Sequence, residues 1–329
     1  MTRPMTLLLP REYIKEATKL INKAKNRVAF ICMILTDDES TDDLIDALAG
    51  AARRGVTVHV AGDMFTYTEM SGQFIPSHYY SKRVRSTTHM AKELHAAGVE
   101  FHWLGRLSMS TVSGRTHSKW CVVDDTVFSF GGVNLYEEAL GNIDYMFRIE
   151  DASLADKIIR EHEHIIKADR GNFDYRSHSY ALTSQSTVLF DAGFFGDSII
   201  YERACSLAAD STRIELVSQY CPTGKLNRLL KQTNSTLYFN PWQQATGLNR
   251  FIIRVGSWFS RQASSYTKKQ YLHAKFIIFT LTSGEKVAIS GSHNFVHGGV
   301  LLGTREIALE TRDPAIIAQL ESFLETYIA

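Results

Sequence analysis

The sequence reads His117-Ser118-Lys119 and then Gly131-Gly132-Val133-Asn134, and later it reads His273-Ala274-Lys275 and then Gly291-Ser292-His293-Asn294. Each copy therefore supplies a histidine, a lysine and an asparagine in the same order. A pattern that returns within one chain predicts a duplicated structural unit. Because both copies place the same polar groups at the same point, we expect the two halves to share one site.

Segments with helical and strand periodicity alternate on both sides of each copy. We expect helices over residues 13–25, 42–54, 90–97, 154–167, 198–209, 226–231 and 314–327. We expect strands over residues 28–35, 55–63, 99–104, 120–123, 127–130, 146–149, 213–220, 236–240, 276–279, 287–290 and 307–310. Asp151 and Asp313 precede the closing helices and suit capping. This alternation predicts an α/β fold, with residues 1–170 as the first repeat, 188–329 as the second and 171–187 as the connector.

The repeated residues provide the groups that phosphodiester chemistry needs. On an extended chain, the histidine and lysine of His-x-Lys project from the same face. One imidazole can attack phosphorus and give a phosphohistidine, while the other protonates the leaving oxygen and then deprotonates the acceptor. Lysine and asparagine can hold the phosphoryl oxygens without a metal or cofactor. The predicted catalytic set is His117, Lys119, Asn134, His273, Lys275 and Asn294.

Each imidazole also needs an acidic partner to orient it, and two residues are candidates. Asp144 and Glu306 follow the two asparagines in corresponding strands. The glycines of the second part of the pattern allow a substrate or another backbone segment to approach closely. No two of the four cysteines form a Cys-x-x-Cys pair, so zinc and dithiol redox chemistry have no support.

The whole pattern resembles the phospholipase D superfamily. His117, Lys119, Asp124 and Asn134 match its signature, whereas the second copy has Thr280 at the aspartate position. The resemblance implies two phospholipase D-like repeats packed as a pseudo-twofold α/β/α sandwich. It also implies His117 as nucleophile and His273 as acid/base, although the sequence itself does not order the two histidines. In that family the aspartate is mainly structural, so Thr280 is expected to alter a hairpin. Asp124 is therefore expected to be a supporting residue, and Ser292 in the Gly-Ser-His-Asn of the second copy is expected to be another.

Within the superfamily, three short segments are similar to cardiolipin synthase-type phosphatidyltransferases: Ser218-Gln219-Tyr220-Cys221-Pro222, Lys23-Ala24-Lys25 and Arg54-Gly55-Val56-Thr57-Val58. The function implied is phosphatidyl transfer of the cardiolipin synthase or phosphatidylserine synthase kind, or phospholipase D hydrolysis with water as acceptor. The alternative is a metal-independent phosphodiesterase or nuclease of the same superfamily. Two motifs in one chain and a net charge of +1 favour lipid over nucleic acid.

Aromatic and basic residues gather in residues 64–85 and again in residues 258–269. Such segments suit a lipid headgroup interface and equally suit stacking on single-stranded bases. Tyr79, Tyr80 and Trp258, together with His293 beside the second motif, are the candidates for substrate binding. His162 and His164 lie two apart on an expected helix, so they face different ways and are expected at the surface.

The composition sets the expected compartment. The chain has 329 residues with 44% hydrophobic content, which predicts a substantial core. Cys32 and Cys121 lie in apolar runs and are expected to be core thiols. No apolar run reaches the roughly 20 residues that span a bilayer. We expect a cytoplasmic protein, peripheral at the membrane surface, whose partners are a phospholipid and an alcohol or water acceptor rather than another protein.

Overall fold

The computed structural model describes residues 4–67, 82–105, 115–171, 175–245 and 247–329. The chain divides into two compact units. Unit 1 comprises Met1–Ser129, Val133–Gly141 and Tyr145–Tyr175, and unit 2 comprises Phe130–Gly132, Asn142–Asp144 and Arg176–Ala329. Two short segments, one inside the first motif and one just before residue 145, therefore belong to unit 2, although the strands that flank them belong to unit 1.

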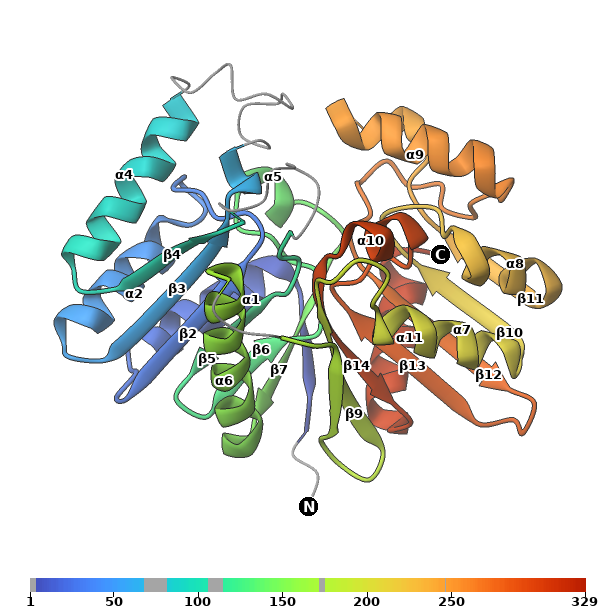
Figure 1. The fold of residues 1–329 in the computed structure, drawn as a ribbon, viewed down its shortest axis with the longest axis horizontal. Coiled ribbons are helices and arrows are strands. Elements are labelled where there is room, and N and C mark those ends of the chain that lie inside the picture. Colours follow the sequence, from blue (N-terminus) through green and yellow to red (C-terminus); the bar gives the residue numbers. More distant parts are fainter. Residues whose placement is uncertain (1–3, 68–81, 106–114, 172–174, 246) are drawn as a thin grey trace. The chain divides into compact units, whose positions relative to one another are not determined.

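Unit 1 is built on a mixed seven-stranded sheet with the order β1-β7-β6-β5-β2-β3-β4 (Figure 1). Its elements are β1 (Thr6–Leu8), α1 (Pro10–Ile21), β2 (Arg27–Cys32), α2 (Asp42–Arg53), β3 (Thr57–Asp63), α4 (Lys82–Ala96), β4 (Glu100–Leu104), β5 (Trp120–Val123), β6 (Thr126–Ser129), α5 (Glu137–Leu140), β7 (Met146–Glu150) and α6 (Ala152–Asp169). Strands β2, β3 and β4 run parallel, and the other pairs are antiparallel.

Helices cover both faces of the unit-1 sheet. The apolar sides of α1, α2 and α4 pack in one cluster with alternate residues of β2, such as Val28 and Phe30. Helix α6 lies on the other face, where it contacts β2, β4, β5 and β6 (Figure 1). The carboxylate of Asp151 caps α6 by accepting a hydrogen bond from Leu154 N at 2.9 Å. Burial of both faces explains why these strands are continuous apolar runs in the sequence.

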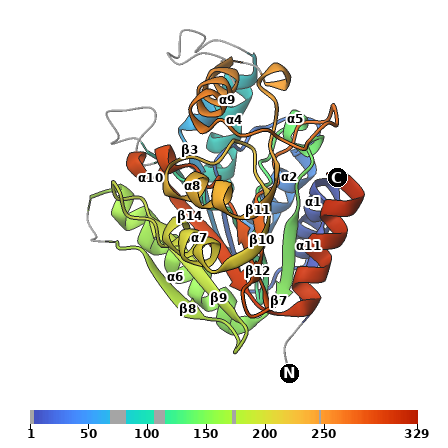
Figure 2. The same cartoon turned by 90° about the vertical axis from the view of Figure 1, so that its right-hand side faces the viewer.

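Unit 2 has its own seven-stranded sheet, with the order β11-β10-β12-β13-β14-β9-β8. Its elements are β8 (His178–Ala181), β9 (Ser186–Ala192), α7 (Ile199–Ala209), β10 (Ser211–Val217), α8 (Gly224–Gln232), β11 (Asn234–Tyr238), the 3-10 turn η1 (Trp242–Gln244), α9 (Gly247–Ser260), β12 (Phe276–Leu281), β13 (Lys286–Gly291), α10 (His297–Leu302), β14 (Arg305–Thr311) and α11 (Pro314–Tyr327). Helices α7 and α8 pack on one face, and α11 packs on the other (Figure 2).

The prediction of two α/β repeats is confirmed, because β1, β7, β6, β5, β2 and β3 have counterparts in β9, β14, β13, β12, β10 and β11 in the same spatial order. The two sheets differ at their edges, where β4 and β8 have no counterpart. Strands β1, β8 and β9 and helices α5, α9 and α10 were not predicted. The stretch 171–187, expected as a connector, contains β8 and the first residues of β9.

Several side-chain positions can be compared with expectation. Cys32 and Cys121 are buried, as predicted. The prediction that His162 lies at the surface is wrong. His162 is 1% exposed and accepts a hydrogen bond from Trp120 Nε1 at 3.4 Å, because α6 is buried on a broader face than the helical pattern indicated. Across the part of the chain that the structure describes, no helix is both long and apolar enough to span a membrane.

Candidate active site

The first motif lies in unit 1 at the start of β5. His117 and Lys119 occupy an extended lead-in that ends where β5 begins at Trp120, so they precede the predicted strand rather than lying in it. Lys119 is 2% exposed and its Nζ donates to the carbonyl oxygen of His117 at 2.7 Å. The His117 side chain is half-buried. The lead-in thus fixes a lysine amine next to the backbone of the motif histidine.

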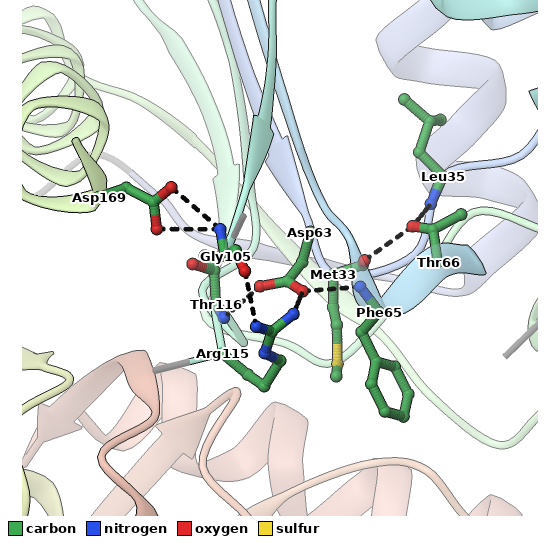
Figure 3. A network of polar contacts seen from close by, with 9 residues as sticks. All are labelled: Met33, Leu35, Asp63, Phe65, Thr66, Gly105, Arg115, Thr116 and Asp169. Atoms are coloured by element: carbon green, nitrogen blue, oxygen red, sulfur yellow. Dashed lines mark hydrogen bonds and ion pairs between the residues drawn. The ribbon is translucent and has the colours of Figure 1, made fainter. Parts of the chain in front are cut away.

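A buried ion pair holds the residues just before His117 (Figure 3). Asp63, the last residue of β3, binds Arg115 Nη1 through Oδ1 at 2.8 Å, and its Oδ2 accepts a hydrogen bond from Thr116 N at 2.8 Å. Arg115 Nη2 donates to the carbonyl oxygen of Gly105 at 2.9 Å. Gly105 has a φ of 79°, and an added Cβ would lie 2.7 Å from Arg115 Nη1, so the backbone requires glycine here.

Burial raises the pKa of the Asp63 carboxyl, and four groups act against that rise: Arg115, the backbone N–H groups of Phe65 and Thr116, and His117. A carboxylate that is removed from water remains charged only when a cation and hydrogen-bond donors replace its hydration. Asp63 therefore depends on Arg115, and together they fix the chain at Thr116.

Unit 2 holds its second motif in the same way but without charge. Asn240 follows β11 and is fully buried. Its Oδ1 accepts a hydrogen bond from Leu272 N at 2.8 Å, and its Nδ2 donates to the carbonyl oxygens of Gln219 at 3.0 Å and Leu272 at 2.7 Å. Leu272 precedes His273 as Thr116 precedes His117. Neither Asp63, Arg115 nor Asn240 was predicted as a site residue. A polar residue closing the same parallel strand in both repeats is the signal that would have found them.

The second motif places a complete ring-orienting contact within unit 2. The Nδ1 of His273 lies 2.6 Å from Oδ2 of Asp144, and both groups are buried. Lys275 Nζ also lies 3.2 Å from this nitrogen and donates to the His273 carbonyl oxygen. The Nδ1 atom of His273 cannot form hydrogen bonds to both groups at once, because the Lys275 ammonium needs an unprotonated nitrogen as acceptor and the Asp144 carboxylate needs an N–H as donor. The shorter contact decides: Nδ1 carries the proton and donates to Asp144, which leaves Nε2 for proton transfer or attack.

Backbone contacts bring Asp144 to the ring. Ile143 N donates to the Tyr271 carbonyl oxygen at 2.9 Å, and the N–H groups of His273 and Ala274 both donate to the Ile143 carbonyl oxygen at 2.9 Å. Gly132 N donates to Asp144 Oδ1 at 3.2 Å. A Cβ on Gly132 would lie 2.8 Å from Asp144 Oδ2, so the second glycine of Gly-Gly-Val-Asn makes room for the carboxylate.

The other predicted acidic residue has a different described contact. Glu306 is buried in β14 and accepts a hydrogen bond from Ser292 Oγ at 2.5 Å. Ser292 Oγ also accepts a hydrogen bond from Ile307 N at 3.0 Å. Ser292 thus ties the start of β14 to the second motif. Asp144 and Glu306 follow their asparagines similarly in the sequence, and each is buried and hydrogen-bonded within unit 2, Asp144 to the His273 imidazole and Glu306 to the Ser292 hydroxyl.

The two asparagines share one property. Asn134 and Asn294 are each 5% exposed, and among the described residues neither side-chain oxygen has a hydrogen-bond partner. Buried amide oxygens are normally hydrogen-bonded, so each of these two oxygens can accept a hydrogen bond from a ligand, whereas the Nδ2 group of the same amide is the donor that a phosphoryl oxygen needs. Asn134 belongs to unit 1 with His117 and Lys119, and Asn294 belongs to unit 2 with His273 and Lys275.

Asp124 supports the hairpin rather than the chemistry. Its carboxylate accepts hydrogen bonds from the backbone N–H groups of Lys25, Asn26 and Arg27 at 2.9–3.1 Å. Burial raises its pKa, but these three donors outweigh that effect and hold the pKa below its usual value. In unit 2, Thr280 lies in β12 opposite Arg213, and the following turn is held instead by Thr282 N, which donates to the Asp210 carbonyl oxygen at 2.8 Å.

The candidates for substrate binding fall in different environments. Tyr79 and Tyr80 lie outside the described residues. Trp258 is 73% exposed on α9. His293 is buried, and its Nδ1 accepts a hydrogen bond from Phe295 N at 2.8 Å, so that nitrogen already has a backbone partner. In the described ranges, no group of three His, Cys, Asp or Glu side chains is arranged to hold a metal ion.

Comparison with protein families places the first motif. Residues 17–166 match the family model described as cardiolipin synthase, PLD-like domain, and this range includes His117, Lys119 and Asn134. Residues 17–166 are thus similar to a PLD-like domain of the cardiolipin synthase type. The resemblance of the sequence to the phospholipase D superfamily, and within it to cardiolipin synthase, is thereby confirmed.

Curated relatives give the same answer over part of their length. Cardiolipin synthase B of Escherichia coli (strain K12) is 26% identical to this chain over 181 residues. Cardiolipin synthase B of Shigella flexneri matches to the same extent. These matches cover 52% of this chain and 40% of each relative, so the chain spans less than half of the curated relatives that it matches.

Solved structures extend the likeness to the whole chain. The crystal structure of phosphatidylserine synthase from Haemophilus influenzae Rd KW20 superposes with a TM-score of 0.73 over 99% of this chain and 86% of that one, at 14% identity. Polyphosphate kinase from Porphyromonas gingivalis superposes with a TM-score of 0.62 over 98% of this chain and 50% of that one, at 11% identity. At these identities the likeness is one of fold.

Proposed function

We propose that this phospholipase D-like chain transfers a phosphatidyl group from a phospholipid to an alcohol, or to water, through a covalent phosphohistidine. The observation that carries the proposal is the buried His273–Asp144 contact at 2.6 Å, with Lys275 beside it and Asn294 in the same unit. The matching His117, Lys119 and Asn134 in unit 1 supply the second set of groups. The match to cardiolipin synthase supports a phosphatidyl rather than a nucleotide substrate.

The reaction divides into two displacements at phosphorus. In the first, a ring nitrogen of His117 forms a bond to phosphorus as the headgroup oxygen leaves and takes a proton from His273. In the second, His273 removes a proton from the acceptor hydroxyl, whose oxygen displaces His117. Asp144 stabilises the positive charge on the His273 ring whenever that ring carries two protons. Lys119, Lys275 and the two asparagines bind the phosphoryl oxygens, whose negative charge compensates the buried amines.

The test is direct product analysis. The purified protein is incubated in EDTA with phosphatidylglycerol liposomes and, separately, with single-stranded DNA. We expect cardiolipin or phosphatidic acid from the wild type, and loss of product in His117→Asn and His273→Asn. His95→Asn, an exposed histidine on α4, is the matched control and is expected to keep full turnover.

The outcomes separate the candidate functions. DNA cleavage with inert lipid would replace the proposal by a metal-independent nuclease. Undiminished product in both motif variants would overturn the proposed catalytic histidines. Quenching during turnover in alkaline denaturant, where a phosphohistidine is stable, followed by mass spectrometry of the peptides at alkaline pH, identifies which histidine carries the phosphatidyl group. A group on His273 would reverse the two assigned roles.

A further inference from the structure

One edge of the unit-2 sheet carries both the second motif and most of the exposed apolar side chains of that unit. At this edge β10 ends with Val217 opposite Phe276, where β12 begins, and β9 ends with Ala192 opposite Arg305, where β14 begins. His273 and Lys275 precede β12, and Asn294 follows β13. We call it the site edge. Every connection that starts or ends there is a neighbour of the candidate active site within the unit.

The first exposed group is made by the connection after β9 and by helix α10. Phe195 is 75% exposed and Leu301 is 55% exposed, and Phe194 and Leu302 are also exposed. Gly196 N donates to the Val300 carbonyl oxygen at 2.9 Å, so the connection and α10 adjoin. Large apolar side chains that gather on a surface mark a contact with a partner or a membrane more often than single ones do.

Helix α9 presents the second group. It lies between the end of β11 and the start of β12, which places it at the site edge (Figures 1 and 2). Phe251 is 65% exposed, and Trp258 is 73% exposed two turns later on the same side of the helix. The guanidinium groups of Arg250 and Arg254 lie 5.1 and 5.4 Å from the ring centre of Trp242. An aromatic face flanked by arginines is typical of a helix that lies in a membrane interface.

The charge of this part of the chain is one-sided. Between Glu215 and Glu285 the sequence contains nine lysines and arginines and no aspartate or glutamate. The net charge of the whole chain is only +1, so the acidic residues that balance these cations lie in other parts of the sequence. The segment includes α8, α9 and the second motif's His-x-Lys. A surface of this sign attracts anionic lipid headgroups.

We propose that the site edge of unit 2, through α9 and the apolar group of Phe194, Phe195, Leu301 and Leu302, docks on the surface of an anionic phospholipid bilayer. This inference rests on the proposed function, since it explains how a chain with a phosphodiester site meets a lipid substrate. Aliphatic Leu301 and Leu302 favour a bilayer over single-stranded nucleic acid, because they gain by entering acyl chains but cannot stack on bases. The arginines supply attraction, and the apolar side chains supply insertion.

The experiment is co-sedimentation with vesicles of phosphatidylcholine containing 30% phosphatidylglycerol, beside vesicles of phosphatidylcholine alone. We expect the wild type to sediment with the anionic vesicles, and Phe195→Glu/Phe251→Glu and Arg250→Glu/Arg254→Glu each to weaken binding at least about tenfold. Phe195→Trp/Phe251→Trp retains the apolar anchors and is expected to bind like the wild type. All four residues are exposed, so the fold does not depend on them.

A matched charge control is available at the opposite edge of the same sheet. Arg213 is exposed at the start of β10 and pairs with Glu215. Arg213→Glu changes the net charge by the same amount per residue as Arg254→Glu but lies away from the site edge. We expect it to leave vesicle binding within about twofold. Equal losses in Arg213→Glu and Arg254→Glu would mean that total charge governs binding, and the docking surface would be rejected.

Turnover of a water-soluble, short-chain phosphatidylglycerol separates this proposal from the proposed function. The docking variants are expected to keep wild-type turnover of that substrate while losing turnover of vesicles. Vesicle binding without any turnover would contradict the proposed function and leave the docking surface intact. Turnover of the short-chain lipid without vesicle binding, or retention on single-stranded DNA that the same variants abolish, would overturn the docking surface.

Discussion

The two units hold the residue before the motif histidine at the same point of the fold, one with charged groups and the other with neutral groups. In unit 1, the Asp63 carboxylate accepts a hydrogen bond from Thr116 N and remains charged in a buried place because Arg115 pairs with it. In unit 2, the Asn240 side chain accepts a hydrogen bond from Leu272 N and donates only to backbone carbonyl groups. Asp63 comes six residues after Thr57, which pairs with Arg27 in the neighbouring strand, and Asn240 comes six residues after Asn234, which pairs with Arg213 in the corresponding strand of unit 2. The comparison teaches that this position requires an acceptor oxygen, and that charge is optional if the remaining atoms are satisfied.

The largest expected effect tests the Asp144–His273 contact beside the Ser292–Glu306 contact. Asp144→Asn keeps an acceptor for His273 Nδ1 but removes the negative charge, so we expect turnover of phosphatidylglycerol to fall by about a thousandfold or more. Ser292→Ala removes the hydroxyl that Glu306 binds and is expected to lower turnover by less than about tenfold. The pH profile of turnover is the second readout, since a merely structural role would leave its midpoints unchanged.

Asp63→Asn breaks the comparison from the charged side. Arg115 then remains buried without its counter-charge, and we expect the free energy of unfolding to fall by about 3–5 kcal/mol in urea titrations. Asp63→Asn/Arg115→Met removes both charges and is expected to recover part of this loss. If the double variant were less stable than the sum of the two single changes, the ion pair would not be the interaction that holds Thr116.

Reciprocal exchange of Asp124 and Thr280 sharpens the comparison of the two hairpins. Asp124→Thr loses an acceptor for three N–H groups and places a β-branched residue at a φ of 50°, so we expect it to cost about 2–3 kcal/mol of unfolding free energy. Asp124→Asn, which tolerates this φ, is the intermediate control. Thr280→Asp restores the motif but is expected to cost up to about 1 kcal/mol, because aspartate disfavours strands. A gain in stability would mean that unit 2 lacks this aspartate to its disadvantage.

The last comparison concerns pH, and the two units are expected to respond in opposite directions. Burial lowers the pKa of His162 to about 3, so the stability of unit 1 is lost as pH falls below the unfolded value of about 6.5. Burial raises the pKa of Asp191 in unit 2 to about 8, so stability is lost as pH rises from about 4 towards 8. His162→Gln and Asp191→Asn should each flatten the corresponding slope, which for one proton is at most about 1.4 kcal/mol per pH unit.

Denaturant titrations at several pH values provide the measurement for both residues. Half-buried His164, on the same helix as His162, gives the control variant His164→Gln, which is expected to leave the acid slope unchanged. An acid slope that survives in His162→Gln would assign the loss of stability to carboxylates. An alkaline slope that survives in Asp191→Asn would likewise remove Asp191 as its cause.

The periodicity of the sequence predicted most core elements because strands buried on both faces and amphipathic helices leave local signatures. Residues 120–123 and 314–327 match β5 and α11. The short strands β1 and β8 have too few residues for a clear period. Helix α9 was not predicted, and only its last residues fall in the aromatic and basic segment 258–269. Apolar residues such as Phe251 and Trp258 occupy its exposed side, where a soluble helix normally carries polar residues.

Some residues of the candidate site could also be predicted from the sequence, and others could be found only from the structure. The His, Lys and Asn positions could be named because one pattern occurs twice. The hydrogen bonds from Thr116 N to Asp63 and from Leu272 N to Asn240 could not be predicted, because each joins a side chain to the backbone of a residue far away in the chain. Asp144 was named as a ring-orienting residue from its place after Asn134. Only the long-range contact between Ile143 and residues 271–274 reveals that the imidazole that Asp144 orients is that of His273.

The assignment of Phe130–Gly132 and Asn142–Asp144 to unit 2 has a consequence for fragments of the chain. A gene fragment encoding residues 176–329 specifies His273, Lys275 and Asn294 but omits the carboxylate that fixes the His273 ring. A fragment that ends before residue 176 carries that carboxylate without its imidazole. Expression of either fragment alone would therefore separate the carboxylate from the imidazole that it orients. The second repeat, although it can be recognised by itself in the sequence, is incomplete without residues 142–144.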